Sequence, residues 1–203
     1  MKDLTESKLS SEQIFSGRLL DVRRDEVSLP EGGTSVREYI RHPGAVVMIP
    51  ILPDGKILLI RQFRYPMGVV EIELPAGKID PGEELEETLQ RELKEETGYK
   101  AGKTTFITEI HPCIGYSNER MWLYLAEYLQ YSEATGDEDE FIELMPTSLD
   151  DAMAMVQSGE ITDVKAVIGL FWAEKVLRGQ WKPSQAKKAD RFNPPARLRA
   201  RFP

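Results

Sequence analysis

Three glutamates on one predicted helix give the strongest chemical signal in the sequence. Residues 84–97 are expected to be helical, because leucines recur at every fourth position and form one apolar stripe. Glu92, Glu95 and Glu96 stand at positions i, i+3 and i+4, so their side chains converge on one face of that helix. Like charges at this spacing repel unless cations neutralise them, and hard divalent cations prefer carboxylate oxygens. The cluster therefore predicts a metal site, with a solvated acidic face as the alternative.

The residues on either side of this helix suit a site that is held in place. Pro75-Ala76-Gly77 and Asp80-Pro81-Gly82 predict a tight loop before the helix. Gly98 is expected to end the helix, because a residue with positive φ is favoured there. Arg91 precedes Glu95 by four residues and can hold it by a charge-assisted pair.

Strands are predicted on both sides of the acidic helix. Residues 15–39 alternate in polarity around a glycine turn and predict a small antiparallel meander. Residues 44–50 and 56–65 are two apolar, β-rich runs, and Pro53-Asp54-Gly55 between them predicts a second hairpin.

The later part of the chain predicts further strands and then helices. Strands are expected at residues 121–131 and 140–145, and helices at residues 150–158 and 163–178. Asp163 is a suitable cap for the last helix, and Gly179 is a suitable stop. The order of elements predicts an α/β or α+β sandwich.

The acidic helix and the loop before it resemble a known motif. The Nudix box has the pattern G-x5-E-x7-R-E-U-x-E-E-x-G-U, in which U is bulky and apolar. The matching residues are Gly77, Glu83, Arg91, Glu92, Leu93, Glu95, Glu96, Gly98 and Tyr99. Only Tyr99 is slightly off type, because its ring carries a polar hydroxyl. The chain therefore resembles the Nudix hydrolase superfamily.

The resemblance covers most of residues 15–180 and points to one branch of the family. The segments Arg61-Gln62-Phe63-Arg64, residues 73–80 and residues 111–119 are similar to ADP-ribose pyrophosphatases. This resemblance implies an α/β/α sandwich around a mixed sheet, preceded by a small antiparallel β-unit that completes a homodimer. The expected units are a dimerisation and substrate-contact unit at residues 1–42, a catalytic Nudix domain at residues 43–181 and a basic tail at residues 182–203.

The resemblance also implies a role for each residue of the box. The expected ligands of Mg²⁺ or Mn²⁺ are Glu92, Glu96 and the backbone carbonyl of Ala76. Glu95 is expected to be a further ligand or to stand directly behind the ligands. Glu83 and Arg91 are expected to orient the others, and Glu83 also suits a helix N-terminus by its charge.

The general base is expected outside the box, on an acidic loop before a late strand. The matching segment is residues 135–141, which implies that Glu138 is the base and Glu140 a further metal ligand. Four consecutive acids leave the register open by one or two residues, and an ordinary acidic surface loop is the alternative.

Substrate contacts are expected from two arginines and one further glutamate. A guanidinium can grip a phosphate by two hydrogen bonds, so Arg64 is expected to contact a substrate phosphate, and Arg37 to do so from the partner subunit. An ordinary surface ion pair is the alternative for each arginine. Glu119 is expected in the substrate site and is the next candidate for the base.

Hydrolysis of ADP-ribose, or of a related nucleoside diphosphate derivative, to AMP and ribose 5-phosphate by metal-activated water is the function that the resemblance implies. Three alternatives remain. One is a nucleotide-sugar pyrophosphatase of the GDP-mannose type. Another is a sensor that binds a nucleotide without cleaving it, although an intact set of metal carboxylates argues against it. The third is an RNA-processing or nucleic-acid-binding role, which would depend on the basic tail at residues 182–203.

Composition restricts the partners that the protein can have. The net charge of −8 argues against nucleic acid, although residues 182–203 carry seven basic residues against one acid and leave the remainder of the chain at −14. No apolar run reaches the length of a membrane span, so a cytoplasmic protein is expected. Cys113, His42 and His111 have no pattern that predicts a nucleophile or a metal site, and structural or rim positions are expected for the histidines.

Overall fold

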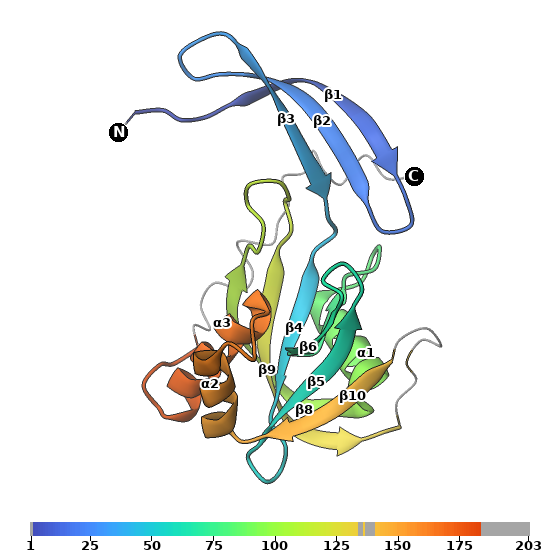
Figure 1. Ribbon diagram of the computed structural model, residues 1–203, viewed down its shortest axis with the longest axis vertical. Coiled ribbons are helices and arrows are strands. Elements are labelled where there is room, and N and C mark those ends of the chain that lie inside the picture. Colours follow the sequence, from blue (N-terminus) through green and yellow to red (C-terminus); the bar gives the residue numbers. More distant parts are fainter. Residues whose placement is uncertain (1, 134–135, 137–140, 184–203) are drawn as a thin grey trace.

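The N-terminal strands form a separate sheet at one end of the molecule (Figure 1). The computed structural model describes residues 2–133, 136 and 141–183. Strands β1 (Ser7–Ser16), β2 (Asp21–Ser28) and β3 (Thr34–Arg41) pair antiparallel in that order. The predicted antiparallel meander is confirmed, but its first strand is earlier than expected. Residues 17–20 form the first turn, which a hydrogen bond from the Gly17 N–H to the Leu20 carbonyl closes at 2.8 Å. The polar sequence of β1 lacks the apolar alternation that marks a half-buried strand.

The rest of the chain forms two further sheets. The first has the order β10-β5-β6, with β10 at Ile142–Thr147, β5 at Ile57–Arg64 and β6 at Val69–Glu73. The second has the order β7-β4-β9-β8, with β7 at Ala76–Lys78, β4 at Ala45–Pro50, β9 at Met121–Tyr131 and β8 at Tyr99–Ile110. Strand β4 pairs parallel with β9, whereas the other strand pairs are antiparallel, so the second sheet is mixed.

The prediction of a hairpin from β4 and β5 is wrong. These strands belong to different sheets, and a single bridge between Ile51 and Ile57 joins them at the turn. Strand β4 pairs instead with β7 and β9, which are distant in sequence. Local turn residues predicted the chain reversal correctly, but long-range pairing decided the neighbours.

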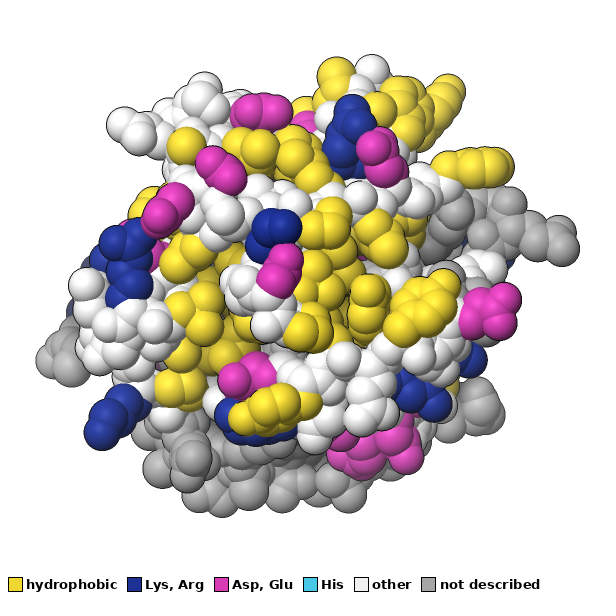
Figure 2. All heavy atoms as spheres, turned by 90° about the horizontal axis from the view of Figure 1, so that it is seen from below, with side chains coloured by type: hydrophobic (Ala, Val, Ile, Leu, Met, Phe, Trp, Pro, Cys, Tyr) yellow, Lys and Arg dark blue, Asp and Glu magenta, His cyan; other side chains and the backbone are white. Residues whose placement is uncertain are grey.

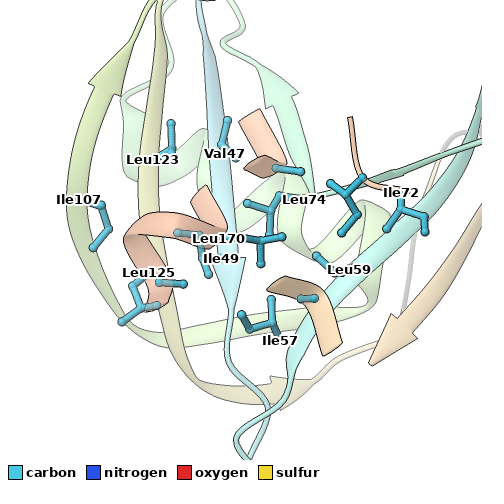
Figure 3. Packing of buried hydrophobic residues seen from close by; sticks show 14 residues of the cluster. Val47, Ile49, Ile57, Leu59, Ile72, Leu74, Ile107, Leu123, Leu125 and Leu170 are labelled. Atoms are coloured by element: carbon cyan, nitrogen blue, oxygen red, sulfur yellow. The ribbon is translucent and has the colours of Figure 1, made fainter. Parts of the chain in front are cut away.

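Helices cover both faces of the sheets and complete an α/β/α sandwich, as predicted. Strand β4 shows the layering: Val46 and Met48 pack in one apolar cluster with Leu89 of helix α1 (Leu85–Thr97). Val47 and Ile49 point the other way, into a second cluster (Figure 3). Helices α2 (Leu149–Ser158) and α3 (Val164–Leu177) pack on that second cluster. A strand buried on both faces has a continuous apolar sequence, as β4 has.

Local capping sets the helix boundaries close to where the sequence predicted them. Helix α1 begins with a capping box between Glu84 and Glu87 and ends at Gly98, whose φ is 76°. Asp163 caps α3 by accepting a hydrogen bond from the Ala166 N–H at 3.0 Å. None of the helices in the described part of the chain is long and apolar enough to cross a membrane.

Candidate active site

The acidic face of α1 borders a cavity of about 490 Å³. Helix α1 contributes Arg91 and its three expected metal-site glutamates to the wall. Lys78 and Asp80 come from the segment just before α1, and the other charged residues of the wall come from distant parts of the chain: Arg64, Glu119 and Lys165. Acidic and basic side chains thus face one space, which suits an anionic ligand held beside cations.

Arg91 organises the carboxylates beside this cavity. Its Nε and Nη2 atoms donate to the two oxygens of Glu83 at 2.8 and 2.9 Å. Its Nη1 atom donates to Glu92 at 2.7 Å and to Glu95 at 3.0 Å. The Lys78 carbonyl accepts a further hydrogen bond from Nη2 at 3.1 Å. One guanidinium therefore fixes three acids and the backbone of the preceding loop.

The hydrogen bonds between Arg91 and Glu83 also keep these two side chains charged. Those from Arg91, above all, lower the pKa of Glu83 to about 2, and the Thr88 hydroxyl contributes at 2.8 Å while partial burial opposes the shift. The same pair raises the pKa of Arg91. Glu83 is therefore an anion throughout the physiological range and acts as the anchor of Arg91.

The loop before α1 lies directly against two of the glutamates. A Cβ atom at Gly77 would stand 1.7 Å from the Glu92 Cδ atom and 2.1 Å from both carboxylate oxygens, so only glycine leaves room for Glu92. The Ala76 N–H donates to Glu96 Oε2 at 3.0 Å. Strand β7, which carries both residues, is held in turn by pairing with β4. The sheet thereby fixes the position of residues 76 and 77 against the glutamates of α1.

The donor set fits a hard divalent cation by its chemistry. Carboxylate oxygens of Glu92 and Glu96 lie beside the backbone of residues 76 and 77, and such oxygens are the preferred ligands of Mg²⁺. Within the described residues, no three His, Cys, Asp or Glu side chains already stand together as a metal-binding group. Part of the reason is that Arg91 draws Glu92 and Glu95 to itself.

Family models and solved structures agree with the geometry. A model described as NUDIX domain matches residues 41–167. The chain belongs to the Nudix family. A second model, described as nucleoside diphosphate sugar hydrolase N-terminal domain, matches residues 6–40.

The alignments with individual Nudix relatives cover nearly the whole length of each relative. The ADP-ribose pyrophosphatase of Bacillus subtilis (strain 168) is 44% identical over 176 residues, which are 86% of this chain and 95% of the relative. The methanol dehydrogenase activator of Bacillus methanolicus is 41% identical, over 83% of this chain and 92% of the relative. A crystal structure of an ADP compounds hydrolase matches with a TM-score of 0.79 and 29% identity, covering 89% of this chain and 98% of that one. The chain is thus a Nudix hydrolase.

Most of the residues expected to form the Nudix site lie together. Ala76, Arg64 and Glu119 border the same cavity as the box residues, and Glu83 stands behind Arg91. Arg37 does not line the cavity; on β3 it donates to both oxygens of Glu6, at 3.0 and 2.5 Å. The two acids assigned on the loop before β10, Glu138 and Glu140, lie outside the described residues.

His42 lies on the cavity wall next to Glu119. Its Nδ1 atom accepts a hydrogen bond from the Gly44 N–H at 3.1 Å and stands 3.7 Å from Glu119 Oε1. Burial lowers the pKa of His42, although the charge of Glu119 opposes the shift. The imidazole is therefore neutral at pH 7 and serves the rim of the Nudix cavity as a fixed polar group.

Two residues of the Nudix cavity region were not singled out from the sequence, Glu73 and Lys165. Glu73 ends β6 and is 2% exposed, and Lys165 lies in the first turn of α3 and is 6% exposed. A lysine in the first turn of a helix opposes the helix dipole, so it needs an acidic partner. The position of Lys165 in the first turn could therefore have indicated a buried ion pair, but the sequence does not show which acid is the partner.

Proposed function

We propose that this Nudix hydrolase cleaves the pyrophosphate bond of ADP-ribose, or of a related nucleoside diphosphate derivative, to give AMP and ribose 5-phosphate. The observation that carries the proposal is the cavity beside α1, which three glutamates of the box line together with Arg64 and Lys165. A diphosphate carries crowded negative oxygens, so it needs a metal on one side and cationic donors on the other. The name of the relative at 44% identity supports ADP-ribose as the first substrate to test.

In this proposal Glu92, Glu96 and the Ala76 carbonyl hold Mg²⁺ or Mn²⁺. When bound, a divalent cation neutralises phosphate oxygens and lowers the pKa of a coordinated water. Arg91 keeps Glu92 and Glu95 in place, and Glu83 keeps Arg91 in place. Glu95 acts as a further ligand or stands directly behind the ligands.

The proton of the attacking water goes to a base that the box does not contain. We assign this role to Glu138 and a further ligand role to Glu140, both on the acidic loop before β10. The position of Glu119 on the cavity wall supports it as the second candidate for the base. A base must come within hydrogen-bond reach of the water it activates.

The N-terminal sheet is proposed to pair with a second copy of the chain in a homodimer. The ten residues of β1 are all exposed, which leaves this strand without packing in one chain. Arg37 would then reach the substrate of the partner subunit, after exchanging Glu6 for a phosphate. The units at residues 1–42 and 43–181 have distinct tasks in this proposal, namely assembly with substrate contact and catalysis.

A nucleotide sugar of the GDP-mannose type is the second candidate substrate. The family model that matches residues 6–40 carries the description nucleoside diphosphate sugar hydrolase N-terminal domain, which favours this class. Both candidates share the diphosphate, and they differ in the base and the sugar.

A substrate panel tests the proposal. The protein is incubated with Mg²⁺ or Mn²⁺ and ADP-ribose, GDP-mannose, NADH or a diadenosine polyphosphate, and the products are identified by mass spectrometry. We expect AMP and ribose 5-phosphate from ADP-ribose at the highest kcat/KM. Protein carrying Glu96→Gln serves as the control for contaminating activity. If none of the four compounds is cleaved with either metal, the proposed function is wrong.

A further inference from the structure

A buried carboxylate joins two of the cations on the cavity wall. Glu73 ends strand β6, and its side chain is 3% exposed. Arg64 of β5 donates to it through Nε at 2.5 Å and through Nη2 at 2.7 Å. Lys165 of α3 donates to the Oε2 atom that also accepts from Arg64 Nη2. Three elements thus meet at one carboxylate next to the catalytic cavity.

The contact with Glu73 uses only one edge of the Arg64 guanidinium. Five N–H groups are available on an arginine, and the bonds through Nε and Nη2 use two of them. Within the described part of the chain, the Arg64 guanidinium makes no other hydrogen bond, and the side chain is 41% exposed on the cavity wall. The remaining fork matches the geometry of a phosphate.

Lys165 is held in a similar way, although it is much more deeply buried. Its Nζ atom donates to Glu73 and to Asp163 Oδ2, the latter at 3.0 Å, and its side chain is 7% exposed. An ammonium has three N–H donors, so one remains for a ligand in the cavity that Lys165 borders. Asp163 also caps α3, which fixes the first turn of the helix on which Lys165 stands.

Stability alone does not explain why Glu73, Arg64 and Lys165 form a buried ion-pair network. A buried ion pair has a large desolvation penalty, and apolar side chains of similar volume usually hold two elements together as well or better. Burial of Glu73 opposes its ionisation, but the hydrogen bonds from Arg64 and Lys165 outweigh burial and lower its pKa. The carboxylate is therefore charged and lies between Arg64 and Lys165 beside the cavity.

We propose that Glu73 is a positioning residue that holds Arg64 and Lys165 as a pair of cations opposite the glutamates of α1, and that Lys165 binds the substrate diphosphate together with Arg64. The inference rests on the proposed function, because it assigns the cationic side of the same site. Lys165 contacts the substrate diphosphate directly in this proposal, whereas Glu73 acts on the substrate only through Arg64 and Lys165.

Lys165 is tested by replacement and by a matched control on the same helix. For Lys165→Met we expect KM for ADP-ribose to rise roughly 10- to 100-fold, the loss expected for one hydrogen bond to a charged group, with kcat nearly unchanged. Lys165→Arg keeps the charge and is expected to recover most of the affinity. Lys175→Met removes an outer lysine of α3 that pairs with Glu174, and it should leave KM unchanged. An unchanged KM in Lys165→Met would overturn the contact.

Glu73 needs a double variant, because Glu73→Gln leaves two cations without their acid and lowers stability. In Glu73→Gln/Lys165→Met one buried cation is removed with the acid, so the thermal midpoint should rise above that of Glu73→Gln. We expect KM to exceed that of Lys165→Met, since Arg64 has also lost its anchor. If the double variant has the same KM as Lys165→Met, Glu73 does not position Arg64 and that part of the proposal is wrong.

Binding of ADP without metal separates this inference from the proposed function. Isothermal titration in the presence of a chelator should give a Kd for ADP that Lys165→Met raises by about the factor seen in KM. If the protein cleaves no nucleoside diphosphate derivative but Lys165→Met still raises the Kd for ADP, the proposed function is wrong and the assignment of the cation pair is supported. If the protein cleaves ADP-ribose and Lys165→Met leaves KM and Kd unchanged, the cation pair alone is wrong.

Discussion

The N-terminal sheet and the sandwich beside it differ in where their apolar residues go. All six residues of β4 are buried between the helices, whereas all ten residues of β1 are exposed. The strands of the N-terminal sheet bury only Asp25 and Val27. Three strands without a packed face are marginal on their own. The sandwich therefore has a core of its own, whereas the N-terminal sheet buries almost no apolar side chains in one chain.

Exposed apolar side chains do not by themselves make this difference. The end of the molecule away from the N-terminal sheet also shows hydrophobic side chains at its surface, with charged groups between them (Figure 2). Apolar atoms contribute more than half of the accessible surface of most folded proteins. What distinguishes the N-terminal sheet is the lack of a buried apolar layer beneath it. The comparison predicts that site residues on the sandwich affect chemistry and those on the N-terminal sheet affect assembly and affinity.

Replacing a metal-site glutamate should give the largest effect. For Glu92→Gln and Glu96→Gln we expect kcat to fall by more than about 100-fold. Replacing a residue that only supports a metal ligand already lowers activity by about 10- to 100-fold, and loss of a ligand itself should cost more. The thermal midpoint without metal should change little, because the sandwich core does not contain these side chains. Glu86→Gln on the exposed side of α1 is the control for turnover. An active Glu96→Gln enzyme would remove the metal-site assignment.

The general base should show a loss of similar size with a different metal dependence. We expect Glu138→Gln to lower kcat by about 10²- to 10⁴-fold without changing the Mg²⁺ requirement. Glu140→Gln should instead be rescued in part by excess Mg²⁺. Titration of Mg²⁺ against turnover distinguishes the two variants. A Glu138→Gln enzyme with normal kcat would move the assignment to Glu119.

Gly77→Ala tests whether turnover requires the close approach of the Gly77 backbone to the Glu92 carboxylate. The added Cβ atom would stand 1.7 Å from the Glu92 Cδ atom, so Glu92 must move. A displacement of about 1 Å at a catalytic site costs roughly 100-fold, and we expect kcat/KM to fall by that order. Gly115→Ala is the control, because a Cβ atom there meets nothing within 4 Å. Normal turnover of Gly77→Ala would show that Glu92 need not stand where it does.

Arg37→Ala tests the N-terminal sheet, where we expect a smaller effect. Loss of a phosphate contact should raise KM by about tenfold with kcat and the fold unchanged. Glu6→Gln is the matched control, since it breaks the same ion pair but keeps the arginine. Equal effects of the two variants would mean that Arg37 is only a surface ion-pair partner.

A chain that lacks residues 1–40 tests assembly directly. We expect it to lose dimerisation and substrate affinity together, which light scattering and KM measurements check. A truncated protein that stays dimeric with an unchanged KM would contradict the shared site.

The smallest expected effect concerns the pH dependence of the Arg91 anchor. The folded-state pKa of Glu83, about 2, is below its ordinary value of 4.5, so its contribution to stability is complete above pH 4.5 and is lost as the pH falls through 2. Glu83→Gln should lower the thermal midpoint at pH 7 by about 2–4 °C. The difference from the intact protein should shrink between pH 4.5 and 2. A difference that is independent of pH would mean that packing, and not charge, explains it.

The sequence by itself determined the features that depend on near neighbours along the chain. Helix α1, its stop at Gly98 and the convergence of Glu92 with Glu96 follow from helical periodicity and capping, because these act within a few residues. The α/β/α class followed from the order of elements together with the resemblance to the Nudix family.

Only the tertiary structure decided which distant residues meet. Lys165 and Glu73 are separated by 92 positions, and no local pattern selects one acid among many as the partner of a lysine. The separation of β4 and β5 into two sheets, and the contact between Gly77 and the Glu92 carboxylate, likewise depend on long-range pairing. Packing of the whole sandwich chooses these neighbours, because the free energy of each contact depends on which other elements are already in place.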